Sequence, residues 1–222
     1  MGQTEPSTET RAPLSRERVL ETAVELADRH GLDWLSMRKL ADEIGVAAMT
    51  LYYYVPNKPE LLDGMIDIVF GEIEPPSLDV DWKTAMRRRA VSTREALNRH
   101  RWAVGLMEGR TTHGPSNLRL HDAVLGCLRA AGFSLEMTVH AYSVQDAYIY
   151  GFALQETDMS PETADDFAAE AQRQMEAYEE ILADYPNLVE VVGGHVAKAG
   201  YDYETEFLFG LDLILDGLDK LR

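Results

Sequence analysis

The chain has 222 residues, 45% of them apolar, and a formal net charge of −17 at pH 7. This length and apolar content suffice for one or two packed cores, and the sequence lacks the run of about 18 apolar residues that a membrane-spanning helix needs. The net negative charge argues against a protein that coats nucleic acid nonspecifically, and the lone Cys127 excludes an internal disulfide and suits a reducing cytoplasm.

The charge is unevenly distributed along the chain. Residues 1–58 carry 7 basic and 9 acidic residues, whereas residues 130–222 carry 4 basic and 19 acidic residues. An N-terminal region that is close to neutral can bind DNA if its few cations face the phosphates. The acidic remainder would repel other DNA and make binding sensitive to salt.

Residues 1–13 are polar and are expected to form a disordered arm. They lack the apolar segment of a secretory signal, so we expect a cytoplasmic protein. A helix is expected from Ser15 to about His30, followed by Gly31. Its apolar stripe is formed by Val19, Ala23, Leu26 and Ala27. Trp34 and Met37 are expected to fill the space between this helix and the next.

Residues 36–54 show the pattern of two short helices joined by a tight corner. The apolar residues of the first helix recur at a spacing of three and four: Leu40, Ala41 and Ile44. Ser36 is placed to cap this helix, and Gly45 stands where a helix can end with a positive φ. A second helix is expected at residues 47–54. This is the helix-turn-helix layout, whose second helix lies in the major groove of DNA.

The second helix carries polar and aromatic side chains that cannot all be buried. A tyrosine can donate its hydroxyl to a phosphate, and a threonine offers a hydroxyl to phosphate and a methyl group to thymine. Arg38 and Lys58 flank the helix and would add positive charge toward the DNA backbone. The candidate DNA-binding residues are Arg38, Ala48, Thr50, Tyr52, Tyr53, Tyr54 and Lys58. The alternative is a small three-helix core with tyrosines half buried at its rim.

The next predicted element is a long apolar helix at residues 58–74. Asn57 and Glu60 form a capping box, and Pro59 is tolerated in the first turn. The apolar face consists of Leu61, Leu62, Met65, Ile66, Val69 and Phe70. Pro75-Pro76 would stop the helix, so we place a domain boundary near residue 75.

Residues 81–100 predict another helix, with Trp82, Ala85, Met86, Ala90, Thr93 and Leu97 facing inward. Its run Arg87-Arg88-Arg89 has three interpretations. It is a nucleic-acid contact, or it is a solvated face that answers the acidic tail. In the third interpretation Arg89 points inward toward an anionic ligand.

Further helices are expected at residues 101–107, 118–131, 134–156, 162–182 and 203–221. Gly132 ends the second of these, and Ser134 caps the third. The helix at 134–156 is apolar on more than one face, which predicts neighbours on several sides. The apolar stripe at 203–221 is broad enough to serve a core and also to pair with a second subunit.

Residues 14–70 resemble the DNA-binding domain of the tetracycline-repressor (TetR) family of regulators, through the run SMRKLADEIGVAAMTLYYYVPNKPELLDGM. The C-terminal half resembles the tetracycline-repressor subclass of that family, through AAGFSLE at 130–136 and FLFGLDLILDGLDKL at 207–221. The resemblance implies an all-α protein. Residues 14–75 would form a three-helix helix-turn-helix domain with its linking helix, and residues 76–222 an effector-binding and dimerisation domain.

The resemblance also implies the partners. In the family, the helices that match 134–156 and 203–221 form a four-helix bundle between two subunits, so a homodimer is implied. A twofold dimer presents two recognition helices about 34 Å apart, which implies a palindromic operator in double-stranded DNA. In the family, the helix that matches 58–74 carries the effector's signal to the DNA.

A pocket for a small organic effector is implied within residues 81–160. In tetracycline-binding members, a histidine and a glutamate hold the drug's magnesium ion, and the matching positions here are Met107 and Gln155. Arg89 and Thr93 match the positions that grip the drug, and all four differ from the drug-binding pattern, so tetracycline is a doubtful effector. The candidate effector-binding residues are Arg89, Thr93, Trp102, Met107, Val124, Tyr142, Asp146 and Gln155. They suit an apolar or aromatic molecule, and plain core packing is the alternative for each.

The sequence gives no sign of catalysis. It contains no GxSxG, HExxH, P-loop or GxGxxG pattern. None of the six histidines pairs with another His or Cys at a spacing of four, so we expect neither a metal site nor a cofactor. We therefore predict a ligand-responsive, homodimeric transcriptional repressor. The alternative hypothesis is an all-helical carrier or enzyme with a vestigial N-terminal domain, which would not need an exposed tyrosine-rich helix.

Overall fold

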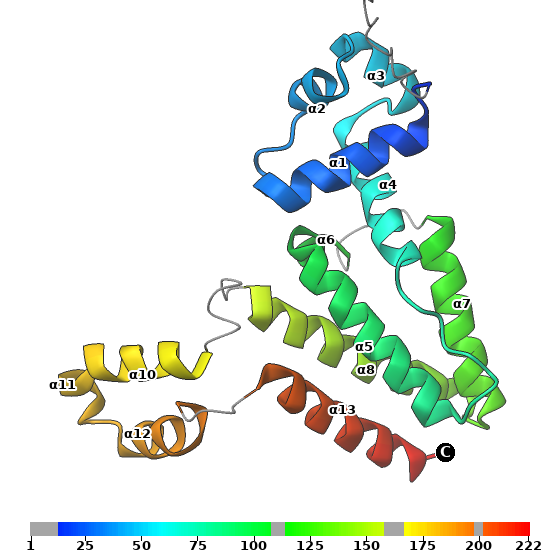
Figure 1. The fold of residues 1–222 in the computed structure, drawn as a ribbon. Helices are drawn as coiled ribbons and strands as arrows, with labels where there is room; N and C mark the ends of the chain where they lie inside the picture. Colours follow the sequence, from blue (N-terminus) through cyan, green and yellow to red (C-terminus); the bar gives the residue numbers. More distant parts are fainter. Residues whose placement is uncertain (1–12, 108–113, 158–166, 198–201) are drawn as a thin grey trace, which may run out of the picture.

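The structure, a computed structural model, describes residues 13–107, 114–157, 167–197 and 202–222. Every regular element in these ranges is a helix, which confirms the predicted all-α class. Figure 1 shows α1–α3 at one end, the long helices α5, α7, α8 and α13 in the other half of the molecule, α4 leading from one to the other, and α10–α12 projecting to one side. The predicted arm at residues 1–13 lies outside the described residues, except for Pro13.

The N-terminal core is built by α1 (Arg16–His30), α2 (Met37–Ile44) and α3 (Ala48–Tyr54). The side chains of Ser15 and Ser36 accept backbone hydrogen bonds in the first turns of α1 and α2, as predicted. Gly45 ends α2 with a φ of 80°, so the chain turns at once into α3. The buried cluster comprises Val19, Leu20, Ala23, Val24, Leu26, Ala27, Leu35, Leu40, Ala41, Ile44, Leu51, Val55, Leu61 and Met65.

The prediction for Trp34 was wrong in part. The Trp34 ring is only half buried and stacks on the ring of His30, with 4.4 Å between the centroids. The ammonium of Lys39 covers the Trp34 ring at 4.0 Å. The neighbouring Leu35 is the residue that fills the space in the N-terminal core. Trp34 therefore covers the edge of that core.

Helix α4 (Lys58–Gly71) belongs to two cores. The Asn57 side chain accepts from the Glu60 N–H at 2.9 Å and caps the helix as predicted. The first half of its apolar face lies in the N-terminal core, and the second half, Ile66, Val69 and Phe70, lies in the C-terminal core. The helix ends at Gly71, three residues before the predicted end at 74.

The C-terminal core is a bundle of four long helices: α5 (Trp82–Arg99), α7 (Pro115–Ala130), α8 (Leu135–Thr157) and α13 (Tyr203–Asp219). The 3-10 turn η1 (Arg101–Ala103) and the short α6 (Val104–Met107) follow α5, where one helix was expected. All six residues predicted to face inward on α5 are buried. Cys127 is buried in the same core, and burial raises the pKa of its thiol, as befits an apolar packing residue.

The arginine run on α5 agrees with the predicted solvated face at Arg87 and departs from it at Arg89. The Arg87 Nε donates to Asp212 on α13 at 2.9 Å, and Lys83 one turn earlier donates to Asp216 at 2.7 Å. These exposed contacts confirm that part of α5 is a solvated face that pairs with the acidic C-terminal helix. Arg89 instead points into the core and is 2% exposed.

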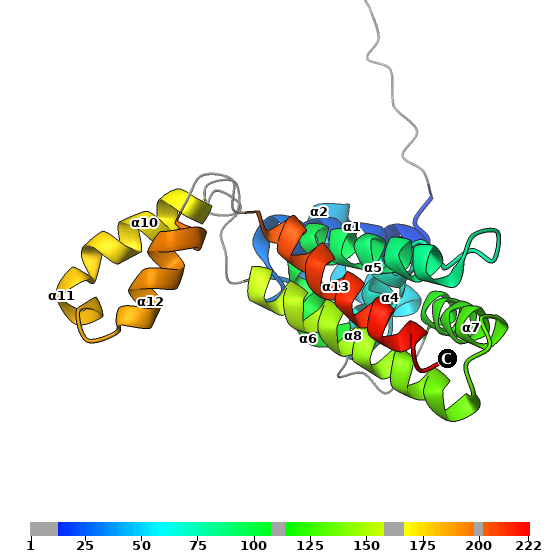
Figure 2. The same cartoon turned by 90° about the horizontal axis from the view of Figure 1, so that it is seen from below.

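Helices α8 and α13 lie side by side (Figure 2). The prediction that α8 has neighbours on several sides is confirmed, because α8 contacts α5, α6, α7 and α13. Each of the two helices nevertheless leaves one apolar face exposed. Large apolar side chains stay exposed on both helices: Leu135, Val139, Val144 and Leu154 on α8, and Phe209 and Leu213 on α13. Such a patch is typical of a protein-protein interface.

A small group of helices follows α8. It consists of α10 (Phe167–Ala177), α11 (Glu179–Leu182), α12 (Pro186–Val191) and a π-helical turn, η2 (Val192–Val196). The single helix predicted at 162–182 is thus divided, and its first residues, up to 166, lie outside the described ranges. The group projects from the bundle in both views (Figures 1 and 2). Exposed apolar side chains line it, among them Tyr178, Ile181, Tyr185, Leu188 and Val191.

A carboxylate on α4 caps α7, a helix of the bundle. The Asp67 Oδ1 accepts from the N–H groups of Ser116 and Asn117 at 2.9 and 3.0 Å. The N-terminus of a helix has free N–H groups and a partial positive charge, so this carboxylate satisfies both needs. Gly114 precedes α7, and a Cβ at this position would overlap the Asp67 carboxyl group.

The first prediction tests this cap. Gly114→Ala is expected to displace Asp67 and to lower the free energy of unfolding by about 1–2 kcal/mol. Gly126→Ala on the same helix is the matched control, because a Cβ there meets no atom within 4 Å. The control should raise stability by about 0.5–1 kcal/mol, since alanine favours a helix interior. Urea unfolding measures both, and equal effects would contradict the assigned contact.

Candidate nucleic-acid interface and candidate ligand site

The exposed face of α3 is the candidate nucleic-acid interface. Leu51 is fully buried and anchors α3 to the N-terminal core. Thr50 is exposed, and Tyr52 and Tyr53 are 42% and 87% exposed. Figure 1 places α3 at the end of the molecule opposite α13. The helix is therefore free to enter a groove while one leucine holds it in place.

Most of the other predicted DNA-binding residues lie around this face. Arg38 on α2 is exposed, and Ala48 is half buried. Tyr54 is half buried against the N-terminal core, and its ring meets that of Tyr53 edge to face at 5.3 Å. The predicted alternative, tyrosines half buried at a rim, thus holds for Tyr54 but fails for Tyr53.

Lys58 is exposed to solvent but also makes a contact within the chain. Its ammonium donates to the carbonyl oxygen of Leu35 at 3.1 Å and ties the start of α4 to the segment before α2. An ammonium has three donors, so two remain for a phosphate. Met49, which is 79% exposed and lies one turn before Tyr53, is not among the DNA-binding residues predicted from the sequence. Its helical position relative to Tyr53 could have indicated it.

A buried ion pair forms the centre of the candidate ligand site. The Arg89 Nη1 lies 2.6 Å from the Asp146 Oδ1, and both side chains are less than a tenth exposed. The two groups are not aligned as a hydrogen bond, and Arg89 Nε also lacks a partner among the described residues. Although burial opposes the charge, Asp146 raises the pKa of Arg89. The Arg89 guanidinium thus stays charged, and both side chains have hydrogen-bonding capacity that is unused among the described residues.

A second polar group lies beside this pair. The Tyr142 hydroxyl contacts His121 Nε2, and His121 Nδ1 lies 3.0 Å from the Asn117 carbonyl oxygen. A carbonyl only accepts, so His121 Nδ1 carries a proton. Burial, followed by the Asp146 charge, raises the pKa of Tyr142, which keeps its hydroxyl a donor. The buried Asn117 Oδ1 and Gln145 Oε1 have no hydrogen-bond partner among the described residues.

The structure brings some of the predicted effector residues together and separates others. Thr93, Met107 and Val124 are buried in the C-terminal part of the chain with Arg89 and Asp146. Trp102 instead lies against α1, where its Nε1 donates to Asp28 at 2.6 Å. Gln155 is exposed on α8. The next residue, Glu156, is buried and forms a bidentate pair with Arg94, at 2.6 and 2.8 Å, which the sequence analysis did not identify.

Within the described ranges, no group of three or more His, Cys, Asp or Glu residues is arranged to hold a metal ion. No helix in those ranges has the length and apolar content to cross a membrane. The structure thus has an exposed aromatic helix, α3, at one end, and a set of buried polar groups around Arg89 and Asp146 in the C-terminal core.

Comparison with known proteins matches the two halves of the chain to two family models. Residues 19–65 match the family described as bacterial regulatory proteins, tetR family, and residues 74–222 match the tetracyclin repressor-like C-terminal domain. The chain is 35% identical to the HTH-type transcriptional repressor DrrR1 of Streptomyces coeruleorubidus, over 97% of this chain and 81% of that protein. It is 31% identical to the class A tetracycline repressor from transposon 1721 in Escherichia coli, over 94% of this chain and 92% of that protein.

Solved structures show the same likeness. The crystal structure of the Streptomyces coelicolor protein ActR in complex with actinorhodin matches with a TM-score of 0.76 at 30% identity. The match covers 93% of this chain and 97% of that one. The similarity therefore includes both the helix-turn-helix region and the bundle.

Proposed function

Because the chain belongs to the TetR family of bacterial transcriptional regulators, we propose that it acts as a homodimer that binds a palindromic operator in double-stranded DNA and is released by a small organic effector. A member of this family is a regulator and not an enzyme, which sets aside the hypothesis of an enzyme with a vestigial N-terminal domain. We also propose that residues 14–75 read the DNA, that residues 76–222 bind the effector and the second subunit, and that the protein works in the cytoplasm, where its DNA is.

The exposed face of α3 is the observation that carries the DNA-binding proposal. A helix that shows Thr50, Tyr52 and Tyr53 to solvent has no packing reason to do so. Tyrosine and threonine hydroxyls can donate to phosphates, and the threonine methyl group can contact thymine. Arg38 and Lys58 on either side of α3 supply charge toward the backbone. Ala48 and Tyr54, which are half buried, are proposed to make closer contacts at the edge of the groove.

The exposed apolar faces of α8 and α13 support the homodimer. Val139 and Leu135 stand one turn apart on α8, and Phe209 and Leu213 stand one turn apart on α13. Two copies of this pair of helices, packed face to face, would bury all four side chains in a four-helix bundle. A twofold axis through that bundle would set the two α3 helices at symmetric positions, which calls for a palindromic site.

The buried polar groups support an effector site between α5, α7 and α8. Arg89, Tyr142 and Asp146 would supply the polar anchors, and Thr93, Met107 and Val124 the surrounding wall. The complex of ActR with actinorhodin is a precedent for a small-molecule effector in a protein similar to this chain. Trp102 and Gln155 lie away from this set, so they remain members only if the second subunit or a movement brings them closer.

A selection experiment tests the proposal. The purified protein is expected to enrich a palindromic duplex from a random pool, and absence of enrichment at low salt would refute the proposed function. Lys58→Ala should weaken binding to all sequences alike and reduce the slope of log affinity against log salt by about one. Thr50→Ala should instead change the enriched sequence. An unchanged sequence with Thr50→Ala would contradict its role in base reading.

A further inference from the structure

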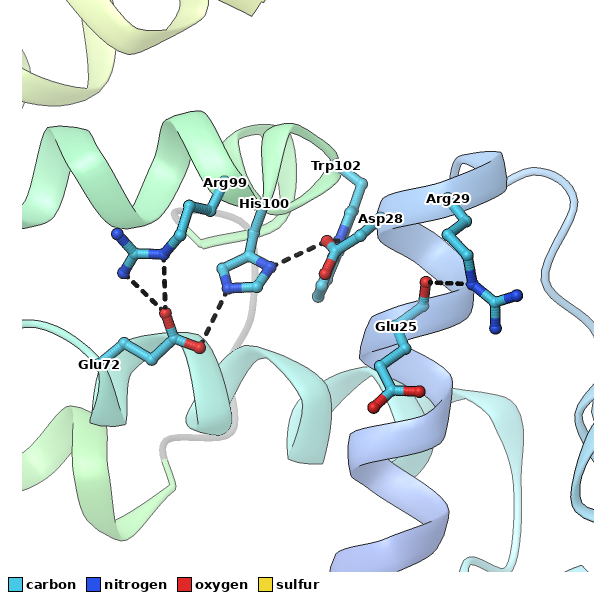
Figure 3. Close-up of polar contacts among 7 residues, drawn as sticks. All are labelled: Glu25, Asp28, Arg29, Glu72, Arg99, His100 and Trp102. Carbon is cyan, nitrogen blue, oxygen red and sulfur yellow. Dashed lines mark hydrogen bonds and ion pairs between the residues drawn. The ribbon is translucent and has the colours of Figure 1, made fainter.

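The N-terminal and C-terminal cores meet at a buried histidine (Figure 3). His100 follows α5 and is 6% exposed. Its Nδ1 lies 2.8 Å from the Asp28 Oδ1 on α1, and its Nε2 lies 3.1 Å from the Glu72 Oε1, just past α4. Each ring nitrogen thus contacts a carboxylate from a different segment, and the ring connects three parts of the chain.

The geometry determines the protonation of this ring. A carboxylate oxygen only accepts hydrogen bonds, so each ring nitrogen must carry a proton to bond its neighbour. A neutral ring would turn a lone pair toward a carboxylate about 3 Å away, which is repulsive. Hydrogen bonds at both ring nitrogens therefore require an imidazolium at position 100.

The other groups around the ring complete the charge balance. The Arg99 guanidinium donates to the Glu72 Oε2 at 2.7 and 3.2 Å, and the Trp102 Nε1 donates to the same Asp28 oxygen as His100. Although partial burial opposes it, hydrogen bonds from Arg99 and His100 lower the pKa of Glu72. Two cations thus face two carboxylates, and loss of the imidazole proton leaves one negative charge unbalanced.

From this arrangement we propose that His100, as an imidazolium, is the positioning residue that fixes α1 and α4 relative to the bundle and so sets the orientation of α3. The proposal rests on the proposed DNA-binding function. A dimer must present both α3 helices at one spacing, and a loosely held helix loses more freedom when it binds. DNA affinity should therefore follow the protonation of this one ring.

The experiment compares the wild-type protein with His100→Gln at constant ionic strength, with the duplex enriched by the wild-type protein as the probe. Wild-type affinity is expected to fall about tenfold between pH 6 and pH 9, the loss of one charge-assisted contact. His100→Gln should bind about tenfold more weakly at pH 6 and show no further fall. His195→Gln, an exposed histidine on η2, is the matched control and should keep the wild-type profile. A fall of wild-type size in His100→Gln would overturn the proposal.

Two measurements need no DNA. The first is the 1H–15N spectrum of the histidine ring nitrogens, in which the signals present in the wild type and absent from His100→Gln belong to His100. These signals should be those of an imidazolium at pH 6, and a neutral ring at pH 6 would overturn the proposal. Hydrogen exchange should accelerate in α1 and in the last turns of α4 in His100→Gln, with α8 and α13 unchanged. Asp28→Asn, on a partly exposed side chain, repeats the test if His100→Gln does not fold, and should abolish the fall in affinity. Failure to enrich any duplex would refute the proposed function. The ring-nitrogen spectrum and hydrogen exchange would still test whether His100 is an imidazolium that holds α1 and α4.

Discussion

Asp146→Leu is expected to destabilise the fold by about 3–5 kcal/mol, because it leaves the Arg89 guanidinium buried without a counter-charge. Arg89→Met should destabilise the fold by a similar amount, because it leaves the Asp146 carboxyl group buried without the guanidinium. The double variant Arg89→Met/Asp146→Leu should recover most of the loss, since apolar side chains of similar volume can replace a buried ion pair. Urea unfolding of the four proteins measures these differences, with m-values to check that unfolding stays two-state.

The exposed pair of Arg29 and Glu43 provides the control. Its atoms lie 3.1 Å apart, but both side chains are about half exposed. Glu43→Gln should change the free energy of unfolding by less than about 0.5 kcal/mol, because water and salt screen a surface pair. If the double variant is as unstable as the two single losses combined, the Arg89–Asp146 pair does not act as one unit.

Tyr53→Ala is expected to weaken operator binding about 10- to 100-fold while the thermal midpoint stays within about 2 °C of the wild type. The side chain is 87% exposed and its only ring contact among the described residues is the edge of Tyr54. Its loss should thus cost little in packing but remove a phosphate donor and its apolar ring from the groove. Titration of the enriched duplex by fluorescence anisotropy measures the change.

Tyr178→Ala is the matched control, because Tyr178 is also an exposed tyrosine but lies beside α11, far along the chain from α3. It should leave operator affinity unchanged. An affinity of Tyr53→Ala equal to that of the wild type would show that α3 does not enter the groove through this residue.

The N-terminal helices could be predicted because their signals are local. A serine or asparagine at the start of a helix, and Gly45 after α2, act on the backbone within four residues. The choice between Trp34 and Leu35 could not be made in this way. Both precede α2 in a short turn, and only the packing of α1 against α2 decides which of them faces inward.

The candidate sites divide in the same manner. The exposure of Tyr53 follows from its position on α3 relative to Leu51, which the sequence contains. The contacts of His100 join it to residues 72 positions earlier and 28 positions earlier, and no spacing pattern indicates them. Likewise, periodicity identified the apolar faces of α8 and α13 but not whether the same chain covers them.

The placement of α4 limits how this protein can be recombined with its relatives. A chimera that fuses its C-terminal helices to the N-terminal helices of a relative needs a crossover point, and the obvious choice would be the prolines after α4. That choice separates Asp67 and Glu72 from the bundle groups they contact, Ser116, Asn117 and Arg99. A crossover within α4, between Met65 and Ile66, keeps those contacts together. The N-terminal helices of the relative must then supply an acidic residue in place of Asp28. Without it, the chimera loses the contacts that His100 and Trp102 make with α1.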